Sequence, residues 1–82
     1  MGARRAMSAD EREFWRAVGR RIELRRLEVG LSQQAVASMI GVTRQEVYRF
    51  EVGEARFSLY QLRKVSSALR VSLVEMMPVS NK

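Results

Sequence analysis

The sequence predicts a single all-α domain of five helices with no strand. Its 82 residues, 46% of them hydrophobic, can form the core of one compact domain but not of two. A residue with a capping side chain, Ser or Thr, stands before each apolar segment of helical period. Gly or Pro follows several of these segments, as is typical where helices end.

The first helix is expected to start near Ser8, where Glu11 completes a capping box, and to run to about Val29. Gly30 can adopt the left-handed conformation that ends such a helix. The apolar stripe of this helix consists of Phe14, Trp15, Val18, Ile22 and Val29. A second, short helix is expected over Gln33–Ile40, capped by Ser32 and ended by Gly41.

The third helix is expected over Arg44–Glu51, because Thr43 and Glu46 form another capping box and Gly53 stands just past its end. A fourth helix is expected over Leu59–Leu69 and a fifth over Leu73–Met77, where Pro78 prevents continuation. Ser58 and Ser72 cap them, with Gln61 and Glu75 three residues later. The expected buried face of the fourth helix is Leu59, Leu62, Val65 and Leu69.

The segment Gln33–Val52 fulfils the requirements of a helix-turn-helix. Two short helices that cross around a tight turn need a small residue on the first helix, a glycine at the bend and apolar anchors on both sides. Ala37 is the small residue and Gly41 is the bend. The apolar anchors are Val36, Ile40, Val42, Val47 and Phe50.

The amino-acid composition excludes several kinds of functional site. Cys and His are absent, which excludes disulfides, thiol nucleophiles, histidine bases and the usual zinc sites. We therefore expect neither an enzyme nor a cofactor or metal. The net charge of +6, carried mainly by Arg, favours a phosphate-bearing partner. This surplus flanks the helix-turn-helix: residues 1–30 and 54–82 each carry +3, whereas residues 31–53 are neutral.

No long apolar run is present, so we expect no membrane span, and Asp10, Glu11 and Glu13 stand where an export signal would be apolar. The expected location is the cytoplasm. Residues 8–78 form the expected domain, and residues 1–7 and 79–82 are expected to be a flexible arm and a flexible tail. Arg4 and Arg5 in the arm either reach along DNA or are simply solvated.

Several motifs together resemble the Cro and phage-repressor helix-turn-helix family, also called the XRE family. They are Gly30-Leu31-Ser32-Gln33-Gln34, Gly41-Val42-Thr43-Arg44, Phe50-Glu51-Val52-Gly53, Ser58-Leu59 and Val71-Ser72-Leu73. The resemblance covers roughly residues 18–77 and implies a compact, five-helix lambda-repressor-like DNA-binding domain. Phe57 departs from the family, in which many members carry Pro before the Ser that opens helix four.

The resemblance implies that the second helix of the motif lies in the DNA major groove. The residues it assigns to base contacts are Arg44, Gln45, Tyr48 and Arg49. Arg can pair with guanine and Gln with adenine; the alternative is a solvated polar face. The residues assigned to phosphate contacts are Gln33, Gln34, Thr43 and Arg56, of which Thr43 also suits ordinary capping.

The resemblance also pairs Arg26 with Glu51 in a partly buried ion pair that orients the motif; a weak surface pair is the alternative. We expect a symmetric dimer through the tail residues Leu73, Val74, Met76, Met77 and Val79, unless Met fills the core there. Leu24 and Leu27, with Ala17, should face outward, either without a role or packed on the N-terminal extension or on a partner. The remaining arginines of helix one should serve solubility: Arg12, Arg16, Arg20, Arg21 and Arg25.

The expected function is a sequence-specific, double-stranded DNA-binding transcriptional regulator, most simply a dimeric repressor at a two-half-site operator. A restriction-modification controller and an antitoxin that regulates its own operator and binds a toxin have the same size and fold. A protein-interaction module without DNA binding is a further alternative, although Arg44, Gln45 and Arg49 argue against it.

Overall fold

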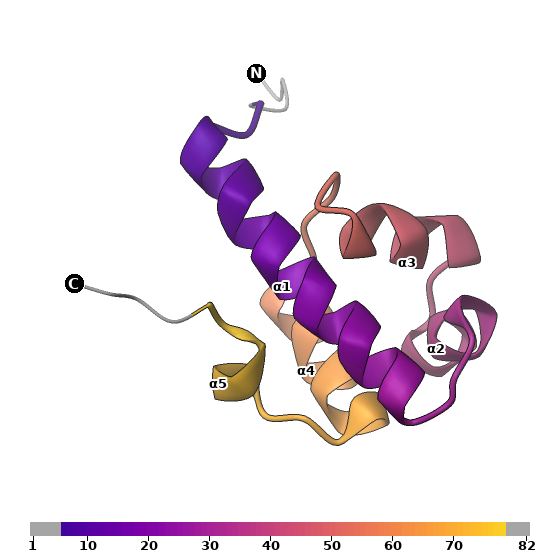
Figure 1. Ribbon diagram of the computed structural model, residues 1–82. Helices are drawn as coiled ribbons and strands as arrows, with labels where there is room; N and C mark the ends of the chain where they lie inside the picture. Colours follow the sequence, from indigo (N-terminus) through magenta and orange to yellow (C-terminus); the bar gives the residue numbers. More distant parts are fainter. Residues whose placement is uncertain (1–5, 79–82) are drawn as a thin grey trace.

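The computed structural model describes residues 6–78, which form five helices and no strand. In chain order these are α1 (Ala9–Glu28), α2 (Gln33–Ile40), α3 (Arg44–Glu51), α4 (Leu59–Leu69) and α5 (Leu73–Met76) (Figure 1). The all-α class and the helix-turn-helix at α2 and α3 are therefore confirmed. Arg4, Arg5 and Val79 lie outside the described residues.

The predicted caps set the helix starts. Capping boxes form at Ser8, Thr43, Ser58 and Ser72, and the Ser32 side chain accepts a hydrogen bond from the Ala35 N–H. These short-range bonds satisfy backbone N–H groups that have no partner within the helix. Two helix ends differ by one residue from the prediction: Val29 is the C-cap of α1, and Met77 is that of α5.

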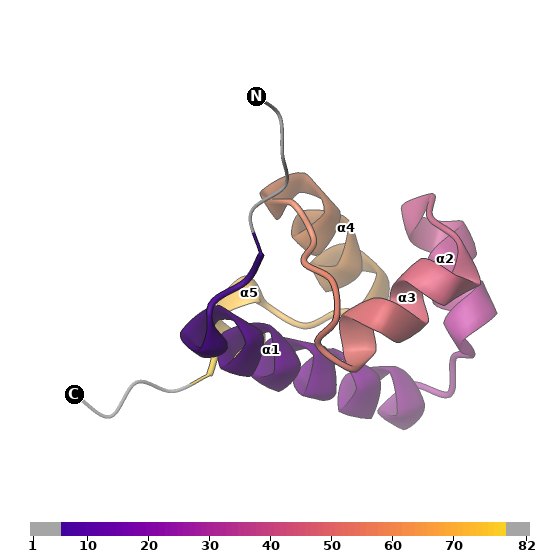
Figure 2. The same cartoon turned by 90° about the horizontal axis from the view of Figure 1, so that it is seen from above.

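The long helix α1 separates two parts of the molecule. In Figure 1, α3 and α5 lie on opposite sides of α1. Turned by 90°, the molecule shows α3 running from the neighbourhood of α2 towards α1 (Figure 2). α3 packs against both α1 and α2, α4 packs against α2, and α5 packs against α1 and α4. α3 is therefore supported by two other helices, α1 and α2.

The core lies where the helices meet, and all five contribute to it. Its largest fully buried side chains are Phe50, Ile22, Leu69, Met76, Val18, Val36, Val47 and Val65. Phe57, from the loop before α4, stacks on Phe50 with 4.0 Å between ring centroids and an interplanar angle of 4°. The residue that departs from the family pattern is therefore part of the core.

Three residues predicted to be buried are exposed instead. Phe14 contacts Trp15 edge-on rather than entering the core, and Val29 lies beyond the end of α1. Leu59 is 72% exposed. Phe57, two residues earlier, is buried instead and stacks on Phe50, so a loop residue enters the core before α4 begins.

Two glycines shape this part of the fold: one forms the bend between α2 and α3, and the other lets α1 approach α3 closely. Gly41 ends α2 with φ +77°, as predicted for the bend. Gly19, in the middle of α1, lies directly against α3: an added Cβ would stand 2.2 Å from the Phe50 carbonyl oxygen. A glycine inside a helical pattern signals such an approach, but the sequence analysis did not single it out.

The C-terminus of α4 is capped from α1 rather than by a glycine. Arg70 adopts the left-handed conformation with φ 55°. The Arg25 guanidinium donates to the Leu69 carbonyl oxygen at 2.8 Å and to that of Arg70 at 3.2 Å. Arg21 donates to the Glu75 carbonyl oxygen at 3.3 Å. Arg21 and Arg25 therefore connect helices, which corrects the prediction that they serve solubility alone.

Candidate functional site

The N-terminal part of α3 presents three of the candidate residues together. Arg44, Gln45 and Tyr48 line an open depression of about 460 Å³. All three are exposed, whereas Val47 and Phe50 on the other face of the same helix are buried. Thr43 holds the start of this helix through its capping box with Glu46. The helix thus offers an exposed polar face on a backbone whose start is fixed by the capping box.

Arg49 lies apart from this depression. Its guanidinium donates to the Glu54 carbonyl oxygen at 3.3 Å, just past the end of α3. The side chain is exposed, but this bond directs it to the C-terminal end of the helix. The structure therefore brings Arg44, Gln45 and Tyr48 together and leaves Arg49 at the margin.

A buried ion pair fixes the far end of α3 to α1. Arg26 Nε lies 2.7 Å from Glu51 Oε2, and Arg26 Nη2 lies 3.1 Å from Glu51 Oε1. The side chains are only 9% and 2% exposed. The hydrogen bonding of the Arg26 guanidinium to the Glu51 carboxylate raises the pKa of Arg26. A third bond, from Arg26 Nη1 to the Leu31 carbonyl oxygen at 2.9 Å, ties in the loop before α2. The predicted pair is present, and it is buried.

Gln33 joins this pair to the exposed face, a role that the sequence analysis missed. Its Nε2 donates to Glu51 Oε1 at 3.0 Å, and its Oε1 accepts from Arg44 Nη1 at 3.4 Å. Gln33 is the first residue of α2 and Arg44 is the first of α3. No local sequence signal announces this contact, because it depends on how the two helices cross.

The starts of α2 and α3 favour an anionic ligand. The first backbone N–H groups of a helix lack partners within it and carry partial positive charge. The side chains of Gln33 and Arg44, the first residues of these two helices, are joined by a hydrogen bond. Among residues 6–78, no group of three or more acidic side chains could hold a metal ion. The arrangement suits phosphate and hydrogen-bonding edges.

The other predicted phosphate contacts occupy different surroundings. Gln34 is exposed on α2, where its Nε2 donates to Ser38 Oγ at 3.3 Å. Arg56, in the loop before α4, pairs with Glu11 near the start of α1 at 3.4 Å. Thr43 uses both its N–H and its hydroxyl within the capping box. Their contact with phosphate stays a prediction.

The tail residues divide between core and surface. Met76 is 1% exposed and belongs to the core, which corrects its assignment to a partner surface. Leu73 is partly buried and packs against that core, and Met77 is also partly buried. Val74, in contrast, is 82% exposed. The α5 side chains that face α1 and α4 are buried, and those on the opposite face of this short helix are exposed.

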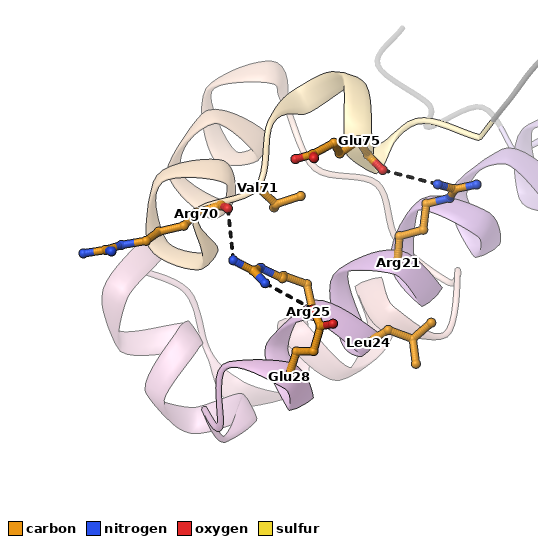
Figure 3. A pocket seen from close by; sticks show the side chains of 7 residues that line it. All are labelled: Arg21, Leu24, Arg25, Glu28, Arg70, Val71 and Glu75. Atoms are coloured by element: carbon orange, nitrogen blue, oxygen red, sulfur yellow. Dashed lines mark hydrogen bonds and ion pairs between the residues drawn. The ribbon is translucent and has the colours of Figure 1, made fainter.

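A groove of about 540 Å³ opens between α1, the end of α4 and α5 (Figure 3). Arg25 and Arg70 meet at one end of it, and Arg21 reaches the Glu75 backbone at the other. Leu24 on its α1 wall is 48% exposed, and Leu27 one turn on is 57% exposed, as predicted.

Within the described residues, no helix combines the length and apolar character needed to cross a bilayer.

Comparisons with known proteins agree with this architecture. A family model described as helix-turn-helix matches residues 22–76. An uncharacterized HTH-type transcriptional regulator of Sinorhizobium fredii is 44% identical over 54 residues, which are 66% of this chain and 38% of the relative. An SPbeta prophage-derived uncharacterized HTH-type regulator of Bacillus subtilis is 41% identical over 54 residues, covering 66% of this chain and 50% of the relative. The chain thus spans half or less of the length of these relatives.

Solved structures with the same arrangement include a controller protein and part of an enzyme. The restriction-modification controller protein C.AhdI from Aeromonas hydrophila matches with a TM-score of 0.77 and 29% identity, covering 83% of this chain and 99% of that one. Hydroxypropylphosphonic acid epoxidase from S. wedmorenis matches with a TM-score of 0.74 and 27% identity, covering 79% of this chain but 35% of the enzyme. The second match therefore concerns one part of a much longer chain.

Proposed function

Because the chain belongs to the helix-turn-helix family, we propose that it is a non-enzymatic, double-stranded DNA-binding transcriptional regulator. In this proposal α3 enters the major groove and the helix starts of α2 and α3 face the phosphates. The surplus of positive charge on both sides of the neutral motif supplies attraction to the duplex. The protein acts in the cytoplasm, where the DNA is.

The observation that carries this proposal is the exposed face at the start of α3. Arg44, Gln45 and Tyr48 share one accessible depression. Arg44 can donate two hydrogen bonds to guanine, and Gln45 can pair with adenine, each good pair supplying about 1–3 kcal/mol of discrimination. A module that binds only proteins would need apolar or acidic side chains at these positions. This face carries one cationic side chain, Arg44, and two uncharged polar ones, Gln45 and Tyr48, which fit base edges better than they fit a protein partner.

We further propose a symmetric dimer that reads two half-sites about 34 Å apart. Val74 supports this because it is 82% exposed on α5, on the side of α1 away from α3. A dimer through this side leaves both α3 helices free for DNA. Sedimentation of the free protein should show a dimer that Val74→Asp converts to a monomer, and a wild-type monomer at all accessible concentrations would contradict the dimer.

A restriction-modification controller is the second candidate function. The match to C.AhdI favours it, since it covers nearly all of that controller and most of this chain. A controller can activate as well as repress, whereas a simple repressor does not activate. Transcription in vitro should separate the two when the operator is placed upstream of a promoter and, in a second template, across it. Activation from the upstream position would favour the controller.

Selection of bound sequences from random double-stranded DNA tests the main proposal. We expect a two-half-site operator and an affinity that falls steeply with salt, because phosphate contacts release counterions. Arg44→Ala and Gln45→Ala should each abolish part of the sequence preference while thermal stability stays nearly unchanged, since both residues are exposed. A shallow salt dependence, or full specificity in both variants, would refute the proposed interface.

A further inference from the structure

The orientation of the Gln33 amide is fixed from inside the protein. Its Nε2 donates to Glu51 Oε1 at 3.0 Å, in a part-buried position. The Glu51 carboxylate also accepts two bonds from Arg26, and in this charged pair it has acceptors only. A flipped amide would place two oxygens against each other at this point. The NH₂ group of Gln33 must therefore face inward.

This orientation leaves the Gln33 oxygen facing the exposed end of α3. There Gln33 Oε1 accepts a hydrogen bond from Arg44 Nη1 at 3.4 Å. Arg44 is exposed and has no other hydrogen-bond or ion-pair partner among the described residues, so this bond is what restrains its guanidinium. Arginine carries five N–H donors in a planar fork, so four remain available for a ligand. The restraint costs Arg44 little binding capacity.

From this chain of contacts we infer that Gln33 is a positioning residue that holds the Arg44 guanidinium in the direction needed for base recognition, with Glu51 setting the polarity of the Gln33 amide. The inference rests on the proposed function. The buried Arg26–Glu51 pair then does more than join α1 to α3. Glu51 fixes the orientation of the Gln33 amide through a bond of 3.0 Å, and the Gln33 oxygen in turn restrains the exposed Arg44 guanidinium through a bond of 3.4 Å.

The physical gain is pre-organisation. A free arginine side chain loses rotational freedom when it binds, and one that is already restrained loses less. A restrained guanidinium also rejects bases that do not match its direction. Without the Gln33 amide, Arg44 can still reach DNA, but its guanidinium has more accessible orientations. The effect should therefore appear in discrimination between bases more than in attraction to DNA as such.

Gln33→Met tests the inference because it keeps the length of the side chain and removes both amide hydrogen bonds. The affinity of wild type and variant is measured for the selected operator and for operators altered at the base pair that Arg44→Ala makes indifferent. We expect Gln33→Met to lower the preference at that base pair by about two- to tenfold. Preference at the base pair assigned to Gln45 should change far less. Gln33→Met in the Arg44→Ala background should produce no further loss of preference.

Two comparisons separate positioning from other effects. Gln34→Met, one residue further along α2, removes an exposed amide whose one side-chain bond within residues 6–78 is to Ser38. If Gln33 acts only as a phosphate contact, both variants should weaken all sequences alike and leave the ratio between bases unchanged. Thermal unfolding of each variant reports any loss of folding, and Arg44→Ala probes the same contact from its exposed side.

The outcomes are distinct. Loss of preference confined to the Arg44 base pair, and absent in the Arg44→Ala background, supports the inference. An unchanged ratio in Gln33→Met, or the same loss with and without Arg44, overturns the inference and leaves the proposed function intact. A wild-type protein that selects no sequence from random DNA overturns both.

Discussion

Removing the positive partner of the buried Arg26–Glu51 pair should destabilise the domain severely. In Arg26→Met the side chain keeps much of its apolar length, but Glu51 loses its bonds at 2.7 and 3.1 Å. The carboxylate is 2% exposed, so water cannot replace them, and of the residues that the structure describes only Gln33 still donates to it. Breaking one side of a pair buried in this way costs about 3–5 kcal/mol.

This loss is large for a chain of this size. A domain of 82 residues has a free energy of unfolding of about 4–12 kcal/mol. At roughly 4–8 °C per kcal/mol, the midpoint Tm should fall by about 12 °C or more. Replacing both partners, as in Arg26→Met with Glu51→Leu, should recover most of the loss because no buried charge is left unpaired.

Thermal unfolding followed by circular dichroism measures these changes. The matched control is Arg20→Met, which breaks the pair with Glu23 at 3.2 Å, where Arg20 is 63% exposed. An exposed pair of this kind contributes at most about 1 kcal/mol. If Arg26→Met lowers Tm no more than Arg20→Met does, the pair is not buried in solution and the reasoning fails.

The dependence of this pair on pH follows from the raised pKa of Arg26. A base whose pKa is raised by folding stabilises the native state below its unfolded pKa, and this contribution is lost as pH rises through the folded pKa. Bonding to Glu51 raises the pKa of Arg26 above an already high value. The difference in stability between wild type and the double replacement should therefore stay constant between about pH 7 and pH 10, and a steep fall in that window would contradict the assignment.

Three further substitutions test the packing around the motif, each by its effect on Tm. Gly19→Ala places a Cβ 2.2 Å from a backbone oxygen of α3 and should cost about 3 kcal/mol or more, whereas Gly30→Ala meets no neighbour and should cost only the conformational strain of about 1–2 kcal/mol. Phe57→Ala removes a stacked core ring and should cost about 3–5 kcal/mol; Tyr60→Ala, at 63% exposure, should cost far less. Arg25→Ala removes the cap of α4 and should cost about 1–2 kcal/mol. An unchanged Tm in any of the first-named variants would contradict the contact described there.

Much of the fold follows from local sequence patterns. The starts of all five helices agree with their capping residues, and the bend at Gly41 has the predicted backbone conformation. The exposed face of Arg44, Gln45 and Tyr48 also follows from helical spacing, because residues three or four apart lie on the same side of a helix. Each of these features is decided by residues within about one helical turn.

The errors arise where distant segments decide the outcome. Leu59 has the spacing of a buried residue but is exposed, whereas Phe57, in the loop before α4, is buried and stacks on Phe50. Met76 and Val74 are both apolar residues of α5, yet the packing of that helix on α1 and α4 buries one and exposes the other. The helical period predicts which residues share a face of a helix, but it does not predict whether another helix packs against that face.

By itself, the sequence determined an all-α domain with a helix-turn-helix, its helix starts, its charge distribution and the residue types offered at the start of α3. Only the tertiary structure decided how those residues are held. Gln33 and Glu51 are 18 positions apart in the chain, and Arg25 and Leu69 are 44 apart. Hydrogen bonds over such separations exist only after the helices have packed, since the partner's position depends on every crossing between them. The orientation of Arg44 is therefore a property of the folded domain, whereas its chemistry was present in the sequence.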